Sequence, residues 1–341
     1  MRPTRLRASP ALVRRPLAPL DAAEQRRHKR RNLLQSLLLL AGMVGLLAVC
    51  GWLLFGPDGV VGMGLGAALA LAFAPRISPQ MVLRLYRARE LTPDQLPPVH
   101  QVLARLSERA GLERVPRLYY VPSAMLNAFA VGSPKDAAIA LTDGMLRHLD
   151  LRELTGVLAH EISHVRNRDL WLMNLADVTG RLTRMMSLLG FGLLLIGLPM
   201  WLGGAGHLPW LLVPLLMFAP QLTMLLQLAL SRSREFDADL DAAGLTGDPA
   251  GLASALAKLE RHQRGLWERI LLPGRQLPEP SLLRSHPPTE ERIARLAALS
   301  GATTEPGPAV AGLRATPREP IALPWQPVRR PARGHLLGFW Y

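Results

Sequence analysis

The feature that most constrains the fold of this chain is a set of apolar segments that are too long for ordinary core helices. Residues 33–55 are apolar and long enough to cross a bilayer, which takes about 20 residues. Residues 59–75 are glycine-rich and would form the shorter return half of a hairpin, while 185–203 and 208–230 would form a second hairpin. Because lipid offers no hydrogen-bonding partner to a backbone, segments of this kind are helical. The sequence therefore predicts two transmembrane helical hairpins.

Two other interpretations of these segments compete with the hairpins. The first segment could belong to a cleaved signal peptide, or to a lipoprotein signal ending at Cys50, but Val49 is too bulky for such a cleavage site and further apolar segments follow. The second hairpin could instead be a buried helical core, because its prolines would kink a membrane helix. These prolines are Pro199, Pro209, Pro214 and Pro220.

The charge of the chain is strongly basic, with a formal net charge of +14 carried mainly by arginine. The arginine-rich N-terminus runs directly into an apolar segment without interleaved aromatic residues, so an anionic lipid surface is a better partner than nucleic acid. Arginines also flank the far ends of both hairpins, whereas the short connections inside them carry none. The positive-inside rule then places both termini and the central domain in the cytoplasm. The lone Cys50 excludes an intramolecular disulfide.

The predicted fold is mainly α, with a small β-sheet, and is divided by the membrane segments. A helix is expected over 93–110, followed by strands at 118–121, 128–131 and 138–141, and by later helices opening at Asp248 and Thr289. The expected divisions are a basic disordered leader (1–31), the first hairpin (32–75), a first catalytic part (76–184), the second hairpin (185–230), a second catalytic part (231–300) and a disordered Pro/Arg-rich tail (301–341).

The motif that carries the chemistry is His160-Glu161-Ile162-Ser163-His164. Residues four apart lie on one face of a helix, so the two imidazoles can bind one divalent metal ion. Glu161 is one step further round the helix, within reach of protons on a water at that metal. Asp150 and Glu153 read as a capping box that opens this helix.

Two histidines leave a zinc ion one protein ligand short of the usual catalytic set. The segment 231–239 offers Glu235 and Asp239, which are four apart and hence on one helical face. Glu235 can ligate the metal, while Asp239 can accept a hydrogen bond from the other ring nitrogen of a ligand histidine.

Several segments together resemble the HtpX-type membrane metalloproteases, which are related to the CAAX prenyl endoproteases and the mitochondrial Oma proteases. The matching segments are 126–132, 141–144, 160–164, 231–239 and 285–293. The resemblance implies an integral membrane gluzincin-type metalloprotease with one Zn²⁺ per chain. It assigns the metal to His160, His164 and Glu235, the general base to Glu161, and a supporting role to Asp239. The basic leader and the Pro/Arg-rich tail are not part of the family pattern.

The remaining candidate residues are less closely defined. His286 precedes Pro287-Pro288, and the corresponding loop of the family lies near the metal, so it could stabilise an oxyanion, act as a fourth ligand in a resting state, or simply pack the turn. Asn127 and Ala128 could bind a substrate backbone by pairing along a strand edge. A turn asparagine is the alternative for Asn127.

These observations predict a zinc-dependent membrane endopeptidase of the bacterial inner membrane, with its active site on the cytoplasmic side. Its partners are protein or peptide substrates and the lipid bilayer, with no nucleic acid, and the resemblance implies quality control of misfolded or damaged membrane proteins. The oligomeric state stays open. The alternatives are a prenyl-peptide endoprotease, a catalytically idle zinc-containing scaffold or chaperone, and a transporter, which the lack of a mid-span charge disfavours.

Overall fold

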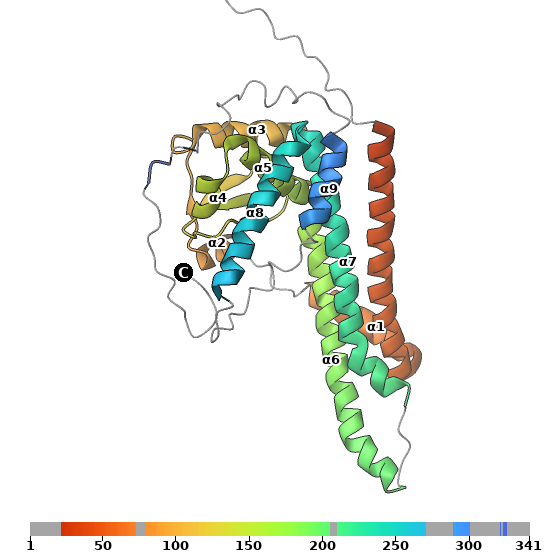
Figure 1. Cartoon of the computed structure of the whole chain (residues 1–341). Helices are drawn as coiled ribbons and strands as arrows, with labels where there is room; N and C mark the ends of the chain where they lie inside the picture. The colour runs from red at the N-terminus through yellow and green to blue at the C-terminus, as the bar shows by residue number, and fades with distance from the viewer. Residues whose placement is uncertain are drawn as a thin grey trace, which may run out of the picture.

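A bundle of long helices stands beside a small domain built on a β-sheet (Figure 1). The computed structural model describes residues 22–72, 79–204, 210–270, 289–300, 321 and 323–325. The expected fold class, mainly helical with a small sheet and membrane helices, is confirmed.

Within the described residues, three helical stretches are long and apolar enough to cross a membrane: Arg30–Leu69, Asp169–Leu202 and Leu212–Thr246. They lie in α1 (Ala22–Ala72), α6 (Asp169–Leu202) and α7 (Leu212–Thr246). Helices α6 and α7 extend beyond the apolar segments 185–203 and 208–230, because α6 begins and α7 ends inside the small domain. Both helices therefore connect the membrane to the candidate site without an intervening loop.

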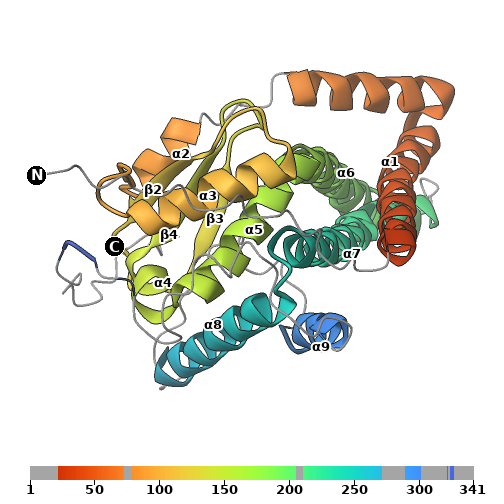
Figure 2. The same cartoon turned by 90° about the horizontal axis from the view of Figure 1, so that it is seen from above.

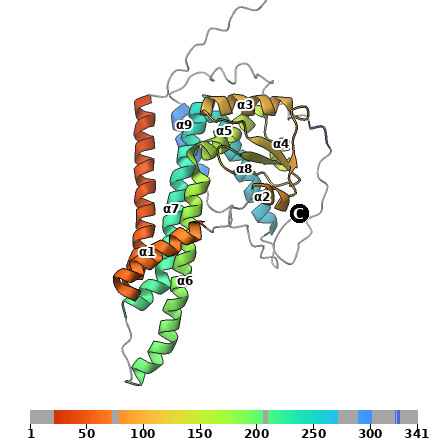
Figure 3. The same cartoon turned by 180° about the vertical axis from the view of Figure 1, so that it is seen from behind.

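Helix α1 differs from the expected first hairpin in two ways. It begins at Ala22, so the last part of the leader that was expected to be disordered is helical. It also turns sharply at Phe55 and Gly56, where Gly56 has a φ of 62°, instead of ending there. Figure 3 shows that the part after this kink runs across α6 and α7 and does not return alongside the first part.

The α6–α7 pair exposes apolar side chains to its surroundings. Leu195 is 78% exposed, Leu188 is 71% exposed and Leu211 is 76% exposed. Such surfaces fit a lipid environment and not the buried helical core that the prolines had suggested. The two helices approach closely at Gly190, where an added Cβ would lie 2.8 Å from the Cβ of Leu216, as small residues allow in membrane helix pairs.

The sheet has the strand order β1-β2-β4-β3. Its strands are β1 (Arg89–Glu90), β2 (Arg117–Val121), β3 (Ala128–Val131) and β4 (Ala138–Thr142). β2 and β4 are parallel, whereas β3 pairs antiparallel with β4 and forms one edge. The expected strands agree with β2, β3 and β4 to within a residue.

Helices cover this sheet and join it to the bundle (Figure 2). The main core packs α3 (Pro97–Ala110), α5 (Leu151–Asn167) and α8 (Pro249–Ile270) with one face of the sheet, and α2 (Pro79–Leu85) places Leu83 against the opposite face. The short α4 (Asp143–His148) was not expected, while α9 (Thr289–Ser300) begins at the expected residue.

Part of the tail that was expected to be disordered packs against the small domain. Ile321, Leu323 and Trp325 contact the main core. The Trp325 ring lies 4.9 Å from that of Tyr120, and its Nε1 donates to Asp143 Oδ1 at 3.3 Å. The disorder prediction is therefore wrong for these residues. It rested on the Pro/Arg-rich composition of the whole tail and overlooked a few apolar side chains that pack against the core.

Candidate metal site

The helix that carries both histidines is fixed at its start by a capping box. Asp150 accepts from the backbone N–H of Glu153 at 2.8 Å, and Glu153 accepts from the backbone N–H of Asp150 at 3.0 Å. The Glu153 carboxylate also accepts from Lys258 of α8 at 2.6 Å. The expected capping box is present, and it ties α5 to α8 as well as opening the helix.

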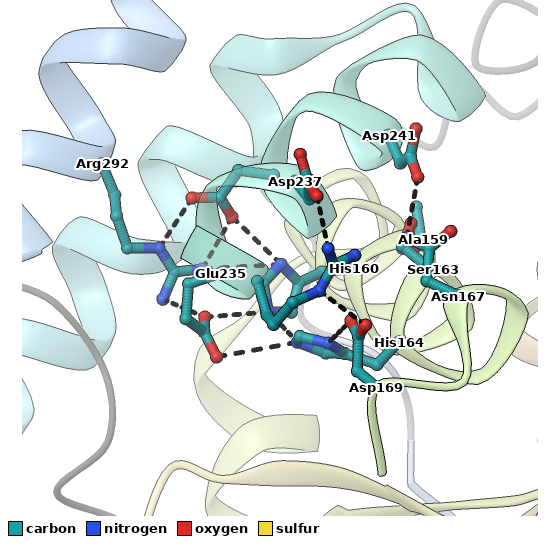
Figure 4. A network of polar contacts seen from close by, with 12 residues as sticks. Ala159, His160, Ser163, His164, Asn167, Asp169, Glu235, Asp237, Asp241 and Arg292 are labelled. Atoms are coloured by element: carbon teal, nitrogen blue, oxygen red, sulfur yellow. Dashed lines mark hydrogen bonds and ion pairs between the residues drawn. The ribbon is translucent and has the colours of Figure 1, made fainter. Parts of the chain in front are cut away.

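One helical turn brings His160 and His164 together, and α7 adds Glu235 (Figure 4). The two Nε2 atoms are 3.1 Å apart. Glu235 lies 3.3 Å from Nε2 of His160 and 3.6 Å from Nε2 of His164. One ligand atom from each residue lies within 4.8 Å of the others, so all three can reach one metal ion.

His160 is oriented by a carboxylate on its other ring nitrogen. Its Nδ1 lies 3.0 Å from Asp239 Oδ1, the contact that the four-residue spacing from Glu235 had suggested. Burial of His160 opposes its charged form, but hydrogen bonds to Asp239 and Glu235 outweigh burial and raise its pKa to about 10. Because a metal ion binds neutral imidazole, a proton and a metal ion compete for Nε2.

His164 is oriented in the same way by a different residue, Asp169, which the sequence reasoning missed. Its Nδ1 lies 2.8 Å from Asp169 Oδ2 at the start of α6. The other oxygen of Asp169 accepts from Arg234 Nε at 2.7 Å. A carboxylate five residues after the second histidine, at the opening of the next helix, was the available sequence signal.

Arg292 of α9 is the other residue that sequence reasoning left without a role. Its Nη1 lies 3.0 Å from Glu235 Oε2, and its Nε and Nη2 donate to both oxygens of Asp239. Burial opposes the charge of Arg292, but Asp239, Glu235 and Glu161 together raise its pKa. An arginine on the inward face of a helix with Ile293 and Leu296 was a signal that could have identified it.

The donor set fits a divalent transition metal. Both Nδ1 atoms are held by carboxylates, so the two Nε2 atoms face each other and the carboxylate of Glu235. Two imidazoles and one glutamate are a ligand set that zinc takes in hydrolytic enzymes, with a position left for water.

The other expected site residues have different placements. Glu161 is half-buried on α5. Asn127 uses its backbone N–H to donate to Thr142 Oγ1 at 3.0 Å, and Ala128 pairs with Leu141 at the start of the edge strand β3. His286 lies outside the described residues.

The two histidines of α5 meet a glutamate of α7, a helix that continues into the membrane bundle, and this arrangement fits a membrane metalloprotease. The chain belongs to a known family of peptidases: residues 93–300 match the family described as "Peptidase family M48". The resemblance to HtpX-type proteases that the sequence motifs indicated is confirmed.

Similar proteins extend over most of the chain. A "Protease HtpX homolog" of Desulforapulum autotrophicum is 37% identical over 279 residues, which is 78% of this chain and 89% of the relative. One from Persephonella marina is 37% identical over 77% of this chain and 96% of its own length. One from Kineococcus radiotolerans is 38% identical over 80% and 99%. A crystal structure of S. mikatae Ste24p aligns with a TM-score of 0.43 and 20% identity, over 79% of this chain and 66% of that chain.

Proposed function

We propose that this protein is a zinc-dependent endopeptidase that hydrolyses peptide bonds in membrane-associated proteins. The observation that carries the proposal is the convergence of His160 Nε2, His164 Nε2 and a Glu235 oxygen within 4.8 Å of one another. One zinc ion per chain would be held by these residues. A bound zinc ion would supply a Lewis acid that polarises the scissile carbonyl and lowers the pKa of a water.

Glu161 is the proposed general base. It follows His160 on α5, so its carboxylate can take a proton from the attacking water and return it to the leaving amine. Its half-buried position leaves it accessible to water while most of α5 is buried. A purely structural zinc site has no need of such a base, which argues against an idle scaffold.

We propose that substrates bind along β3. This strand pairs with β4 on one side and is at the edge of the sheet, so its other side can pair with an extended peptide. The contact between α5 and β3 places this edge near the histidine helix. Ala128 at the start of β3 would pair with the substrate backbone, while β4 holds the strand from the opposite side. The backbone groups of Asn127 already bond to Thr142, so Asn127 would contribute its side-chain amide.

The proposed location is the bacterial inner membrane, with the metal site and both termini in the cytoplasm. The arginines at the far ends of the apolar segments support this orientation through the positive-inside rule. Because α6 and α7 run from the apolar surface into the site, the protease would act close to the bilayer. We propose misfolded or damaged membrane proteins as its substrates, because the membrane helices would confine the protease to proteins near the bilayer.

The test is Glu161→Gln in the full-length protein purified in detergent. The variant should retain zinc, measured by metal analysis, and should lose cleavage of an unfolded protein substrate, because the ligands stay while the base is lost. Glu113→Gln, an exposed change far along the chain from the motif, is the matched control. Equal cleavage by wild type and Glu161→Gln would refute the mechanism.

The same preparation separates the alternatives. Wild type that holds zinc but cleaves neither unfolded proteins nor prenylated peptides would favour an idle scaffold or chaperone. Cleavage confined to prenylated C-terminal peptides would favour a CAAX-type endoprotease.

A further inference from the structure

The first membrane helix is connected to the metal site through a polar side chain near the start of its apolar stretch. The Asn32 amide of α1 donates to Asp237 Oδ1 of α7, across 205 residues of sequence. One turn further along α1, Ser36 Oγ lies 3.3 Å from Ser233 Oγ, also on α7. The two helices are therefore joined by polar contacts where α1 enters the membrane segment.

From Asp237 the contacts continue to the metal site. Arg234 Nη1 lies 2.8 Å from Asp237 Oδ2, and Arg234 Nε donates to Asp169 Oδ1 at 2.7 Å. Asp169 in turn holds His164 Nδ1 at 2.8 Å. These residues, Asn32, Asp237, Arg234, Asp169 and His164, form what we call the His164 network, and Figure 4 shows its part around Asp237, Asp169 and the two histidines.

Two buried carboxylates of the network share one guanidinium. Asp169, Arg234 and Asp237 are all buried, and one guanidinium serves both carboxylates. In a low-dielectric interior such a guanidinium is attracted by both carboxylates. A carboxylate with too few hydrogen-bond donors draws the guanidinium away from the other one. The amide of Asn32 supplies Asp237 with a further donor, which leaves Arg234 directed toward Asp169.

We propose that Asn32 is a positioning residue: its hydrogen bond to Asp237 fixes Arg234 and Asp169, and so sets the orientation of His164 for metal binding. This hydrogen bond depends on the rotation of α1 about its axis, because a rotation by one residue turns the side chains by about 100°. Removal or rotation of α1 would loosen a metal ligand without touching the metal. This inference rests on the proposed zinc site.

The experiment measures the rate at which zinc passes from the full-length protein in detergent to a chromogenic chelator. Mutation of a residue that hydrogen-bonds a metal ligand commonly lowers metal affinity about 10–100-fold. Asn32 is further from the metal than such a residue, so we expect Asn32→Ala to accelerate zinc loss by about 10-fold, the lower end of this range. Asn32→Gln, which keeps an amide donor, should recover part of this loss. Ser36→Ala, which removes a hydroxyl from the same α1–α7 contact outside the network, should release zinc as the wild type does.

Melting of each metal-free protein separates an effect on folding from an effect on the metal. Equal melting temperatures with faster zinc release in Asn32→Ala would support the positioning role. Unchanged zinc release in Asn32→Ala, or equal acceleration in Ser36→Ala, would overturn it. A wild type that holds no zinc would instead refute the proposed function itself, so the two failures are distinguishable.

Discussion

Arg292 donates to both oxygens of Asp239, at 2.7 Å from Nε and at 2.6 Å from Nη2. Asp239 lies in turn 3.0 Å from His160 Nδ1, and Arg292 also contacts Glu235. The guanidinium on α9 therefore holds two residues of α7: a proposed metal ligand, Glu235, and the partner of another, Asp239. This two-point contact suits the planar fork of arginine and not the ammonium group of lysine.

We expect Arg292→Ala to lower zinc affinity by about 10–100-fold, because it releases Asp239 and leaves buried carboxylates without their cation. Arg292→Lys should recover only part of this loss. Competition with a chelator of known affinity measures the effect. The matched control is Arg295→Ala, one turn further along α9, where the exposed side chain pairs with Glu291. Equal zinc affinities for the Arg292→Ala and Arg295→Ala variants would contradict the proposed role.

Glu235→Ala should remove zinc more completely than Arg292→Ala, since it deletes a proposed ligand and not a partner of one. Metal analysis after gel filtration should find little zinc in this variant, whereas Glu161→Gln should retain it. Glu291→Ala, an exposed change on α9, serves as the control for loss of a carboxylate. Full zinc occupancy in Glu235→Ala would move the third ligand to another residue.

The parts of the structure that local sequence determines could be predicted. The capping box of Asp150 and Glu153, the four-residue spacing of the histidines, and strand β3 depend on neighbours in the chain, and the structure contains all of them. The four-residue spacing of Glu235 and Asp239 likewise predicted that both lie on one face of α7, and both contact His160.

The residues that were missed depend on contacts between distant elements. Arg234 reaches Asp169 across 65 residues of sequence, and Arg292 reaches Asp239 across 53. No periodicity marks such pairs, because a buried arginine in a helix looks like a solvated one until its carboxylate partners are placed. The same reason hides the tail, where Trp325 meets Asp143 across 182 residues.

The orientation of the chain is open to a direct test. Reporter fusions near Gly204, in the connection between α6 and α7, should report a periplasmic location, as should fusions after Pro57 in the kink of α1. Fusions after Glu90 and after Leu245 should report the cytoplasm, because arginines flank those ends. A cytoplasmic signal near Gly204 would mean that the α6–α7 pair does not cross the membrane.

His286 lies six residues before Arg292, whose contacts anchor the first turns of α9 at the site. We expect His286→Ala to lower turnover on the order of 10²-fold while zinc stays bound, as loss of an oxyanion donor does. Higher activity with tighter hydroxamate binding would instead identify His286 as a fourth ligand of a resting state. Unchanged activity in a variant that melts earlier would leave it a packing role.

The contact of the tail with the small domain should contribute to stability. Trp325 is half-buried against Tyr120, donates to Asp143, and offers its carbonyl oxygen to Arg147 Nη2 at 3.3 Å. Truncation of a fully buried tryptophan costs about 3–5 kcal/mol, so for a half-buried ring we expect about 2 kcal/mol from Trp325→Ala. In a domain of this size that corresponds to a melting temperature roughly 5 °C lower.

Trp325→Phe separates the two contributions, because it keeps a ring against Tyr120 and removes the donor to Asp143. We expect it to lose about 1.5 kcal/mol, the lower end of the range for a hydrogen bond to a charged group. Thermal unfolding in detergent, followed by circular dichroism of the zinc-loaded protein, measures both variants. If Trp325→Ala melts with the wild type, the tail adds nothing to the stability of the domain, and its packing on Tyr120 and Asp143 is too weak to matter in solution.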